Sequence, residues 1–527
     1  MTPLLHLHHV LRYLKIGPGR PFAKRHLFGN MKKTFLINTL LWVTLVSPQN
    51  LSAQDERLHH VTLKQAHTGT LEVDTLLLDS YGPPPGNIRQ FYLQSRAILS
   101  EKKDRDFTHP EIIESAKKNG IALMGEPMLG DLGSDRVSIW LRPARRDLLT
   151  IKLGDEDGKV IRQFKSGSIE PGVAKRIIID GLTPDTHYRY SILSDENILA
   201  NGHFTTAPTP KEKGVMRLAF GADFHKIGLH NPKLFREISK REPRVMLLYG
   251  DSAVDGRKGM VNMHRADYLL RDSSQAWKKF VSHTPVYATW DDWDYFANDK
   301  SGVPKQYKHS DRKAVRAVWH ENWNNPIRDK ERKGIYFSTR LGPVEIFMLD
   351  TRSCRQNEKR GQHACYLGKA QQEWLKKGLK ESNAPFKILS SGTMWSDYVS
   401  KAKDSWGSWD TKGREEIFSL IESEKVGGVL LLSGDRHGAR GFKIPRPSGF
   451  AFHEFGVGTL GGVPGPPALV ENCPQQLFGY EGEGTIAFGE FTFDTSRKDP
   501  TVTFRLISES GEHLEKHILP LSQLTPQ

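Results

Sequence analysis

The stretch Leu218-Ala219-Phe220-Gly221-Ala222-Asp223-Phe224-His225 is an apolar run that ends in an acid and a histidine. Four later apolar runs end in a similar way, in Gly250-Asp251, Asp291-Asp292, Asp350-Thr351-Arg352 and Gly434-Asp435-Arg436-His437. Continuous apolar runs are typical of strands that are buried on both faces, and helical stretches such as residues 371–382 separate them. We therefore expect an α/β layered domain after residue 214.

The acids at these strand ends are expected to converge, because ligands of α/β sheets bind beyond the carboxyl ends of the strands. A single aspartate after a strand commonly caps the next helix. Five such ends, two of them with Asp-x-His spacing, indicate a shared site instead. Carboxylates gathered in one crevice repel one another unless a cation neutralises them, so the sequence predicts a site for two divalent or trivalent cations. The predicted ligands are Asp223, His225, Asp251, Asp292, Asp435 and His437.

Residues 205–214 have the pattern of a linker, because small and charged residues and two prolines interrupt every apolar period. The region before this linker has a different pattern of apolar residues. Short alternating runs at residues 137–141 and 175–179 predict antiparallel strands. Residues 182–188 resemble the tyrosine corner of immunoglobulin-like and fibronectin-like sandwiches, in which Tyr188 bonds back to upstream backbone. We therefore expect a small β-sandwich before the α/β domain.

The chain is expected to have four parts. Residues 1–53 are an upstream segment with a signal peptide, and residues 54–125 are an N-terminal extension. Residues 126–208 form the β-sandwich, and residues 215–520 form the α/β domain. Within the extension, the stretch before Gly120 has the pattern of a short amphipathic helix, and the role of the extension stays open.

The formal charge of +14 on 527 residues raises the question of nucleic-acid binding. Residues 1–53 contain seven Lys and Arg residues and no Asp or Glu, so half of the charge lies in this segment. The remainder has no basic block interleaved with aromatic residues. We therefore expect no dedicated nucleic-acid surface. A hydrophobic content of 37% and a charged content of 26% are typical of a folded, enzyme-sized protein.

The N-terminal segment has the pattern of a Sec-type signal peptide that starts at Met31. Lys32 and Lys33 precede a mostly apolar stretch at residues 34–46, and a small-residue cleavage pattern ends at Ala53. This stretch is too short to cross a membrane. We therefore expect no transmembrane anchor, and a periplasmic or secreted chain that begins near Gln54.

The three cysteines leave the disulfide pattern open. In an oxidising compartment, Cys354 and Cys365 are close enough in sequence to close a short loop, with Cys473 left over. Three unpaired thiols are an equal alternative, because three cysteines cannot form a disulfide framework.

At the predicted metal ligands the sequence resembles the binuclear metallophosphoesterases, whose blocks read Asp-x-His, Gly-Asp, Gly-Asn-His and Gly-His-x-His. It is most similar to the PhoD-like alkaline phosphatase (alkaline phosphatase D) family. That family's Trp-Asp-Asp-His-Asp-Tyr block stands here as Trp290-Asp291-Asp292-Trp293-Asp294-Tyr295, and its Ser-Gly-Asp-Arg-His block occupies residues 433–437. The resemblance covers the chain from about residue 125 to its end. It implies an α/β/β/α metallophosphoesterase sandwich preceded by the β-sandwich.

The resemblance also implies how the metals are held. One metal would be bound by Asp223, His225 and His437 and the other by Asp292 and Asp435, with Asp251 bridging both. A hydroxide on the metals would be the nucleophile, since bound cations make hydroxide available near neutral pH. The identity of the two metal ions stays open among Fe, Mn, Zn and Ca, because Phe224 stands in the block where some members carry a Cys for iron.

Further residues are implied in catalysis and substrate binding. Arg352 and Arg436, with Asp251, complete the catalytic set, and the two arginines would pair with phosphate oxygens, as suits the guanidinium fork. A structural salt bridge at a strand end is an equal alternative for each arginine. Trp293, Tyr295 and Asn298 are candidates to line the substrate pocket, although such aromatic residues more often pack in the core.

Two departures from the family bear on the mechanism. Trp293 stands where the family has a His that is expected to give a proton to the leaving group. Residues 390–395 supply no ligand where the wider superfamily has one more His.

The sequence thus predicts a secreted or periplasmic, metal-dependent hydrolase of small or polymeric phosphate esters, with monoesters and diesters both open. Because of Trp293, two alternatives remain: a metal-binding protein without catalysis, and a hydrolase of non-phosphate esters.

Overall fold

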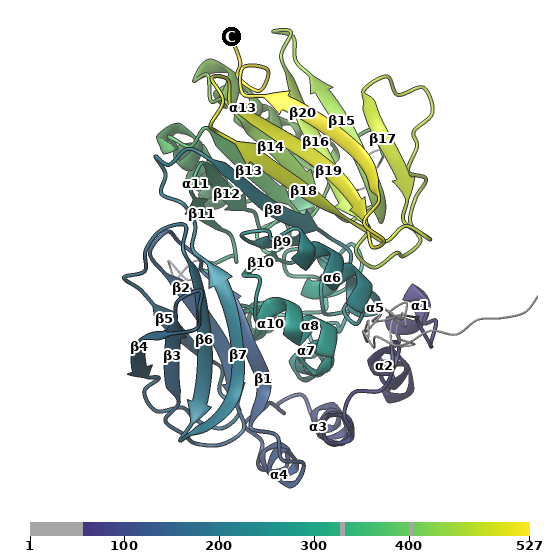
Figure 1. Cartoon of the computed structure of the whole chain (residues 1–527). Helices are drawn as coiled ribbons and strands as arrows, with labels where there is room; N and C mark the ends of the chain where they lie inside the picture. Colours follow the sequence, from purple (N-terminus) through teal and green to yellow (C-terminus); the bar gives the residue numbers. More distant parts are fainter. Residues whose placement is uncertain (1–55, 327–332, 400–403) are drawn as a thin grey trace, which may run out of the picture. The chain divides into compact units, whose positions relative to one another are not determined.

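Two β-sheets form the centre of the region after residue 214 (Figure 1). The structure is a computed structural model that describes residues 56–326, 333–399 and 404–527. One sheet has the strand order β10-β9-β8-β18-β19-β20 and the other β11-β12-β13-β14-β16-β15-β17. Strands β8, β9 and β10 are parallel neighbours, as are β12, β13, β14 and β16. This agrees with the buried parallel strands that the apolar runs predict.

The bounds of these strands place each predicted apolar run inside a strand. The first sheet consists of β8 (Val215–Gly221), β9 (Met246–Tyr249), β10 (Val286–Thr289), β18 (Ala487–Asp494), β19 (Thr501–Ser508) and β20 (His513–Pro520). The second consists of β11 (Phe337–Leu341), β12 (Val344–Met348), β13 (Phe386–Ser391), β14 (Val429–Ser433), β15 (Gly438–Pro445), β16 (Ala451–Gly458) and β17 (Gln476–Glu481).

The inner faces of the two sheets pack against each other through aromatic side chains. The rings of Phe386 and Phe493 are 5.0 Å apart, and those of Phe455 and Phe504 are 4.3 Å apart. Along β8, Leu218 and Phe220 face this inner core, whereas Ala219 faces the outer helices. Because successive side chains of a strand alternate in direction, one apolar run can fill both cores.

Helices cover both outer faces. The six-stranded sheet packs against α6 (Pro232–Lys240), α7 (Val261–Ser273), α8 (Gln275–Val281) and α10 (His309–Asn322). The seven-stranded sheet packs against α11 (Lys369–Glu381) and α13 (Thr411–Ser423). Shorter elements are α5 (His225–Gly228), α9 (Asp292–Tyr295), the 3-10 helix η2 (Asn357–Lys359) and α12 (Trp406–Trp409). The layers follow the α/β/β/α order that the resemblance implies.

Antiparallel strands fill the region before the linker, as predicted. A three-stranded sheet contains β1 (Leu123–Gly130), β2 (Val137–Pro143) and β5 (Lys175–Ile179). A four-stranded sheet contains β3 (Thr150–Gly154), β4 (Val160–Lys165), β6 (His187–Ser194) and β7 (Asn197–Thr205). The hydroxyl of Tyr188 accepts a hydrogen bond from the backbone N–H of Thr183 at 2.9 Å, which is the bond expected of a tyrosine corner. The immunoglobulin-like character of this region stays a prediction.

The N-terminal extension is helical and packs against the α/β region. It contains α1 (Leu63–Ala66), α2 (Leu71–Leu78), α3 (Gly86–Glu101) and α4 (Pro110–Lys118), and α4 is the predicted amphipathic helix. Leu77, Tyr92 and Leu99 share a buried cluster with Ile227 of α5 and Leu270 of α7. The extension thus contacts the elements that follow β8 and β9.

All three cysteines are free, so the possible loop disulfide between Cys354 and Cys365 is not formed. The thiol of Cys365 donates instead to the carbonyl of Trp409 at 3.1 Å. No helix within residues 56–326, 333–399 and 404–527 is long and apolar enough to cross a membrane. The predicted signal peptide lies outside the described residues.

Candidate metal centre

The six predicted ligands all follow the carboxyl ends of parallel strands. Asp223 and His225 come after β8, Asp251 after β9 and Asp292 after β10, and these three strands are neighbours in one sheet. Asp435 and His437 come after β14 in the other sheet. The structure brings side chains from both sheets together, as the convergence argument predicts.

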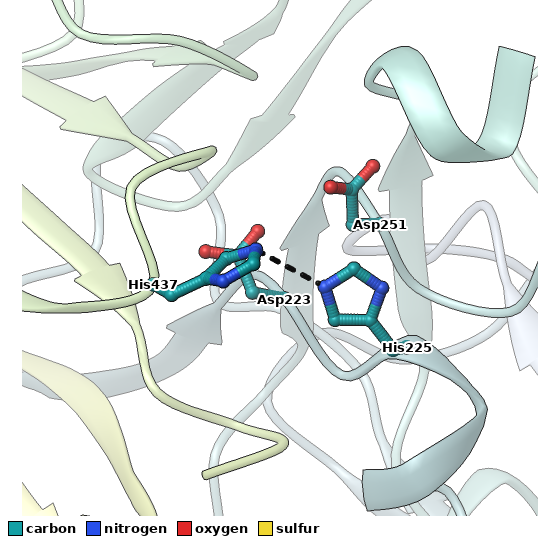
Figure 2. Close-up of side chains that lie close together, drawn as sticks. All are labelled: Asp223, His225, Asp251 and His437. Carbon is teal, nitrogen blue, oxygen red and sulfur yellow. Dashed lines mark hydrogen bonds between the residues drawn. The ribbon is translucent and has the colours of Figure 1, made fainter. Parts of the chain in front are cut away.

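Four of these side chains form a first group. One ligand atom from each of Asp223, His225, Asp251 and His437 lies within 4.8 Å of the others. Figure 2 shows the rings of His225 and His437 next to each other in an edge-to-face arrangement, and their Nε2 atoms are 3.3 Å apart. The Nδ1 atom of His225 is bound to Asp255 at 2.9 Å, and that of His437 to the carbonyl of Pro464 at 2.6 Å. These bonds leave both Nε2 atoms for the group, the arrangement that metal-binding histidines adopt.

A second set of carboxylates adjoins the first. Asp251 also groups with Asp291 and Asp292, and Asp292 groups with Asp404 and Asp435. Asp251 therefore belongs to two groups, as a bridging ligand must.

Arg352 separates the roles of the two adjacent aspartates after β10. Its guanidinium donates to both carboxylate oxygens of Asp291, at 2.5 and 2.7 Å. Asp292 accepts the N–H of Asp299 at 2.6 Å with Oδ2, while its buried Oδ1 has no hydrogen-bond partner among the described residues. Asp292 is therefore the aspartate with a free ligand atom.

The buried carboxylates of the site are suited to bind cations. Both carboxylate oxygens of Asp223 are buried without a hydrogen-bond partner in the described part of the chain. Burial, together with the charges of Asp292 and Asp291, raises the pKa of Asp251 well above its usual range. Burial and the charge of Asp291 raise the pKa of Asp292 to about 7. Since a bound cation would favour the charged carboxylates, the residues present fit a site for hard or borderline metal ions.

Most of the predicted ligands also have an uncommon backbone conformation. Five of the six predicted ligands have φ in the left-handed region: Asp223 (59°), His225 (45°), Asp251 (48°), Asp435 (71°) and His437 (29°). This region is uncommon for residues with a Cβ and costs each of them about 1 to 2 kcal/mol, although Asp and His adopt it more often than most. Such strain clusters at functional sites, where the surrounding structure enforces it.

Two glycines make room for these carboxylates. A Cβ at Gly458, at the end of β16, would lie 2.1 Å from Oδ2 of Asp223. A Cβ at Gly392 would lie 2.5 Å from Oδ1 of Asp291. The segment at residues 390–395 therefore shapes the site, although none of its side chains joins the metal groups found among the described residues.

The two arginines differ in position. The side chain of Arg436 is 13% exposed and its guanidinium lies 2.5 Å from Asp435, so it borders the site. Arg352 is fully buried and is bound to Asp291 and, at 2.8 Å, to Asp404. For Arg352 the structure favours the salt-bridge alternative over contact with a substrate.

The other residues predicted to bind substrate also differ in how far they are buried. Tyr295 is fully buried and its hydroxyl donates to the carbonyl of Gly302 at 2.5 Å, so its polar atom is bound within the protein, and a part for Tyr295 in substrate binding stays a prediction. The short helix α9 turns its ring inward, against Trp290. Asn298 is exposed and donates to Asp299 at 3.0 Å. Trp293 is partly exposed, and its backbone N–H donates to Asp251 at 3.2 Å.

Three residues near the centre are absent from the sequence prediction. Asp255 holds His225, Asp404 joins Asp292 and Asp435, and His67 of the extension lies with His225 and Asp255. Asp255 follows the Gly-Asp block closely, which is a weak signal. His67 and Asp404 have no spacing signal, because tertiary packing alone brings them to the site.

Comparisons with known proteins find similarity to phosphatases. Residues 256–476 match a family model described as PhoD-like phosphatase. Alkaline phosphatase D of Bacillus subtilis (strain 168) is 24% identical over 372 residues, which cover 58% of this chain and 63% of that protein. The chain therefore spans less than two thirds of the length of that relative.

Two solved structures share the fold. A structure of PhoD matches with a TM-score of 0.61 and 17% identity, covering 77% of this chain and 92% of that one. Purple acid phosphatase PPD1 from yellow lupin (Lupinus luteus) matches with a TM-score of 0.55 and 15% identity, covering 75% and 74%.

Proposed function

The chain is a member of the PhoD-like phosphatase family through residues 256–476, and from this premise we propose that it is a metal-dependent hydrolase of phosphate esters. The observation that carries the proposal is that Asp251 belongs to two adjacent groups of buried ligand side chains, drawn from both sheets. A phosphoester hydrolase with two cations needs such a shared carboxylate, because the cations must lie close together to act on one phosphoryl group.

The proposed ligand sets are those that the family resemblance implies, and Asp292 links Asp251 to Asp435 because it belongs to one group with each of them. Asp223, His225 and His437 hold one cation, Asp292 and Asp435 hold the other, and Asp251 contacts both. When bound, the cations neutralise charge on the phosphoryl group and activate water for attack. Asp255 and the carbonyl of Pro464 accept from the Nδ1–H groups of His225 and His437, which keeps each Nε2 lone pair available.

The arginines have different tasks in this proposal. Arg436 borders the site with a side chain that is 13% exposed, and in this proposal it pairs with phosphate oxygens of the substrate. Arg352 positions the site instead: by binding both oxygens of Asp291, it leaves Asp292 as the ligand. We also propose that the chain is exported to the periplasm or secreted, on the signal-peptide pattern at residues 31–53.

Turnover after metal exchange tests the function. The purified chain is stripped with a chelator, reloaded separately with Fe, Mn, Zn or Ca, and assayed with an aryl phosphomonoester, a bis-aryl phosphodiester and an aryl carboxylic ester. We expect turnover of a phosphate ester that depends on the metal and is lost in Asp251→Asn. Two bound metals without any turnover would support the non-catalytic alternative. Turnover of the carboxylic ester alone would support the alternative that the chain is a hydrolase of non-phosphate esters.

A further inference from the structure

A loop rich in glycine and proline lies between β16 and β17 and contacts two segments that supply predicted metal ligands. Its residues 461–467 read Gly-Gly-Val-Pro-Gly-Pro-Pro. The backbone N–H of Gly461 donates to the carbonyl of Asp223 at 3.0 Å. The carbonyl of Pro464 accepts from Nδ1 of His437 at 2.6 Å. The loop therefore holds one predicted ligand by its backbone and another by its imidazole.

Arg440 joins this loop to the segment that carries His437. It lies on β15, and its side chain is buried, with 1% of the residue exposed. Nη1 of its guanidinium donates to the carbonyl of Arg436 at 2.6 Å and to that of His437 at 3.3 Å. Nη2 donates to the carbonyl of Pro466 at 2.5 Å. One buried side chain thus binds the peptide of a predicted ligand and the loop that supplies the hydrogen-bond acceptor of that ligand.

The backbone that Arg440 binds has an uncommon conformation. His437 has a φ of 29°, in the left-handed region, and such a residue persists where the surrounding structure enforces its conformation. Gly465 of the loop packs against the same peptides, because a Cβ there would lie 2.6 Å from the carbonyl oxygen of His437 and 3.0 Å from that of Arg436. Arg440 and the loop together therefore constrain the backbone of His437.

This inference deepens the proposed function and rests on it. We propose that Arg440 is a positioning residue, which holds His437 in place for the cation that the first group of ligands binds. By binding three carbonyls at once, its guanidinium keeps Nε2 of His437 beside Nε2 of His225. The guanidinium suits this task because its donors lie in one rigid plane. Groups that orient a metal-binding histidine raise the affinity of the site without touching the metal.

Arg176 of β5 is a matched comparison for a purely structural role. Its guanidinium also donates to two backbone carbonyls, those of His320 and Trp323 at the end of α10. Neither of these residues belongs to the metal groups found in the described part of the chain. Loss of either arginine is expected to destabilise the fold, because it leaves buried carbonyls without a donor. Only the loss of Arg440 is expected to weaken metal binding.

Four substitutions in the full chain test the assignment. Arg440→Gln removes the guanidinium, Arg440→Lys keeps the charge on a single nitrogen, and Arg176→Gln is the control. Gly465→Ala displaces the loop against His437 without changing any charge, and it decides the question if Arg440→Gln does not fold. Each metal-free variant is titrated with Zn²⁺ in a calorimeter, which gives the number of sites and their affinities. The midpoint of thermal unfolding is measured in parallel.

We expect the wild type to bind two Zn²⁺ ions and Arg440→Gln to weaken one of the two binding events by about 10- to 100-fold. Gly465→Ala should weaken the same event, and Arg440→Lys should weaken it less than Arg440→Gln does. Arg176→Gln should bind both ions as the wild type does, even if it unfolds at a lower temperature. Wild-type affinity in folded Arg440→Gln would overturn the assignment, as would an equal loss in Arg176→Gln. If Arg440→Gln does not fold, wild-type affinity in Gly465→Ala overturns it.

The same titration separates this inference from the proposed function. If the wild type binds no Zn²⁺, the metal centre itself is wrong, and the role of Arg440 is rejected with it. If the wild type binds two Zn²⁺ ions and the variants behave as expected, the role of Arg440 is supported. A failure to hydrolyse any phosphate ester after metal exchange would then contradict the proposed function alone.

Discussion

Asp255 and His225 form a fully buried pair in which a carboxylate oxygen lies 2.9 Å from Nδ1 of the imidazole. Burial alone would raise the pKa of Asp255, but the hydrogen bond with His225 holds it well below its usual range. The carboxylate therefore stays charged and fixes the ring of His225 with Nε2 toward His437. Carboxylates that orient metal-binding histidines in this way raise the affinity of the site.

The first prediction concerns this pair. Asp255→Asn keeps the shape of the side chain and removes its charge, so we expect the metal affinity to fall by about 10- to 100-fold. Calorimetric titration of the metal-free chain measures the change. Asp157→Asn, at an exposed position in the β3–β4 turn, is the control and should bind metal as the wild type does. Unchanged affinity in Asp255→Asn would show that Asp255 does not support a ligand.

The second prediction concerns Asp251, which belongs both to the group with Asp223, His225 and His437 and to the group with Asp291 and Asp292. Asp251→Asn removes the charge that both proposed cations share, so we expect fewer than two metals per chain and loss of most activity, with the fold largely kept. Plasma mass spectrometry gives the metal content, and circular dichroism checks the fold. A folded variant that retains two metals would place the bridging ligand elsewhere.

The third prediction concerns the stability of the metal-free chain as a function of pH. Burial and Asp291 raise the pKa of Asp292 to about 7 in the folded chain, above the ordinary value of an aspartate. The folded state then binds more protons than the unfolded state between about pH 4 and pH 7, so its stability falls as the pH rises through this window. We expect a lower unfolding midpoint at pH 7.5 than at pH 5.5 after chelation. Saturating metal should raise the midpoint at pH 7.5, because it binds the folded state alone. If saturating metal does not change the unfolding midpoint at pH 7.5, the result contradicts a metal site at these carboxylates.

The strands and the residues directly after them account for most of the features of the fold and the site that could be predicted from the sequence. Buried parallel strands have no polar alternation, and their carboxyl ends meet at one edge, so continuous apolar runs followed by acids predict both the layers and the convergence of Asp223, Asp251, Asp292 and Asp435. The position of a residue in the chain is enough for this argument, because the backbone topology brings those positions together.

The direction and partners of side chains are set by packing and could not be predicted in the same way. Tyr295 and Arg352 follow strand ends as expected, yet both are buried and bound to protein groups. Asp255 and His67 reach the site from loops, through ion pairs and stacking that depend on residues distant in the chain. No sequence pattern predicts a role for the extension, because its contribution lies in these tertiary contacts.

The fourth prediction concerns export. The apolar stretch at residues 34–46 is too short to remain as a membrane anchor, so the exported chain should begin near Gln54. Sequencing the N-terminus of protein recovered from outside the cytoplasm decides the point. An intact N-terminus at Met1 or Met31, recovered with membranes, contradicts the signal-peptide interpretation.

The last prediction concerns Asp74, through which the extension is joined to the metal centre. Its buried carboxylate binds both Lys226 and Arg96, whose side chains are also almost fully buried. Asp267 lies 3.5 Å from Lys226 and is already bound to Arg257 at 2.6 Å, so it cannot replace Asp74 for both cations. Removing the charge of Asp74 therefore leaves buried cations without full compensation.

We expect Asp74→Asn to lower the free energy of unfolding by about 3 to 5 kcal/mol, the usual cost of breaking one side of a buried ion pair. Asp79→Asn, at the end of the same helix, removes a more exposed pair with Arg89 and should cost no more than about 1 kcal/mol. Denaturant unfolding of both variants gives the comparison. Because Lys226 adjoins His225, the surviving folded Asp74→Asn chain should also bind metal more weakly than Asp79→Asn. Equal stability and equal metal affinity of the two variants would mean that the extension packs against the centre without positioning it.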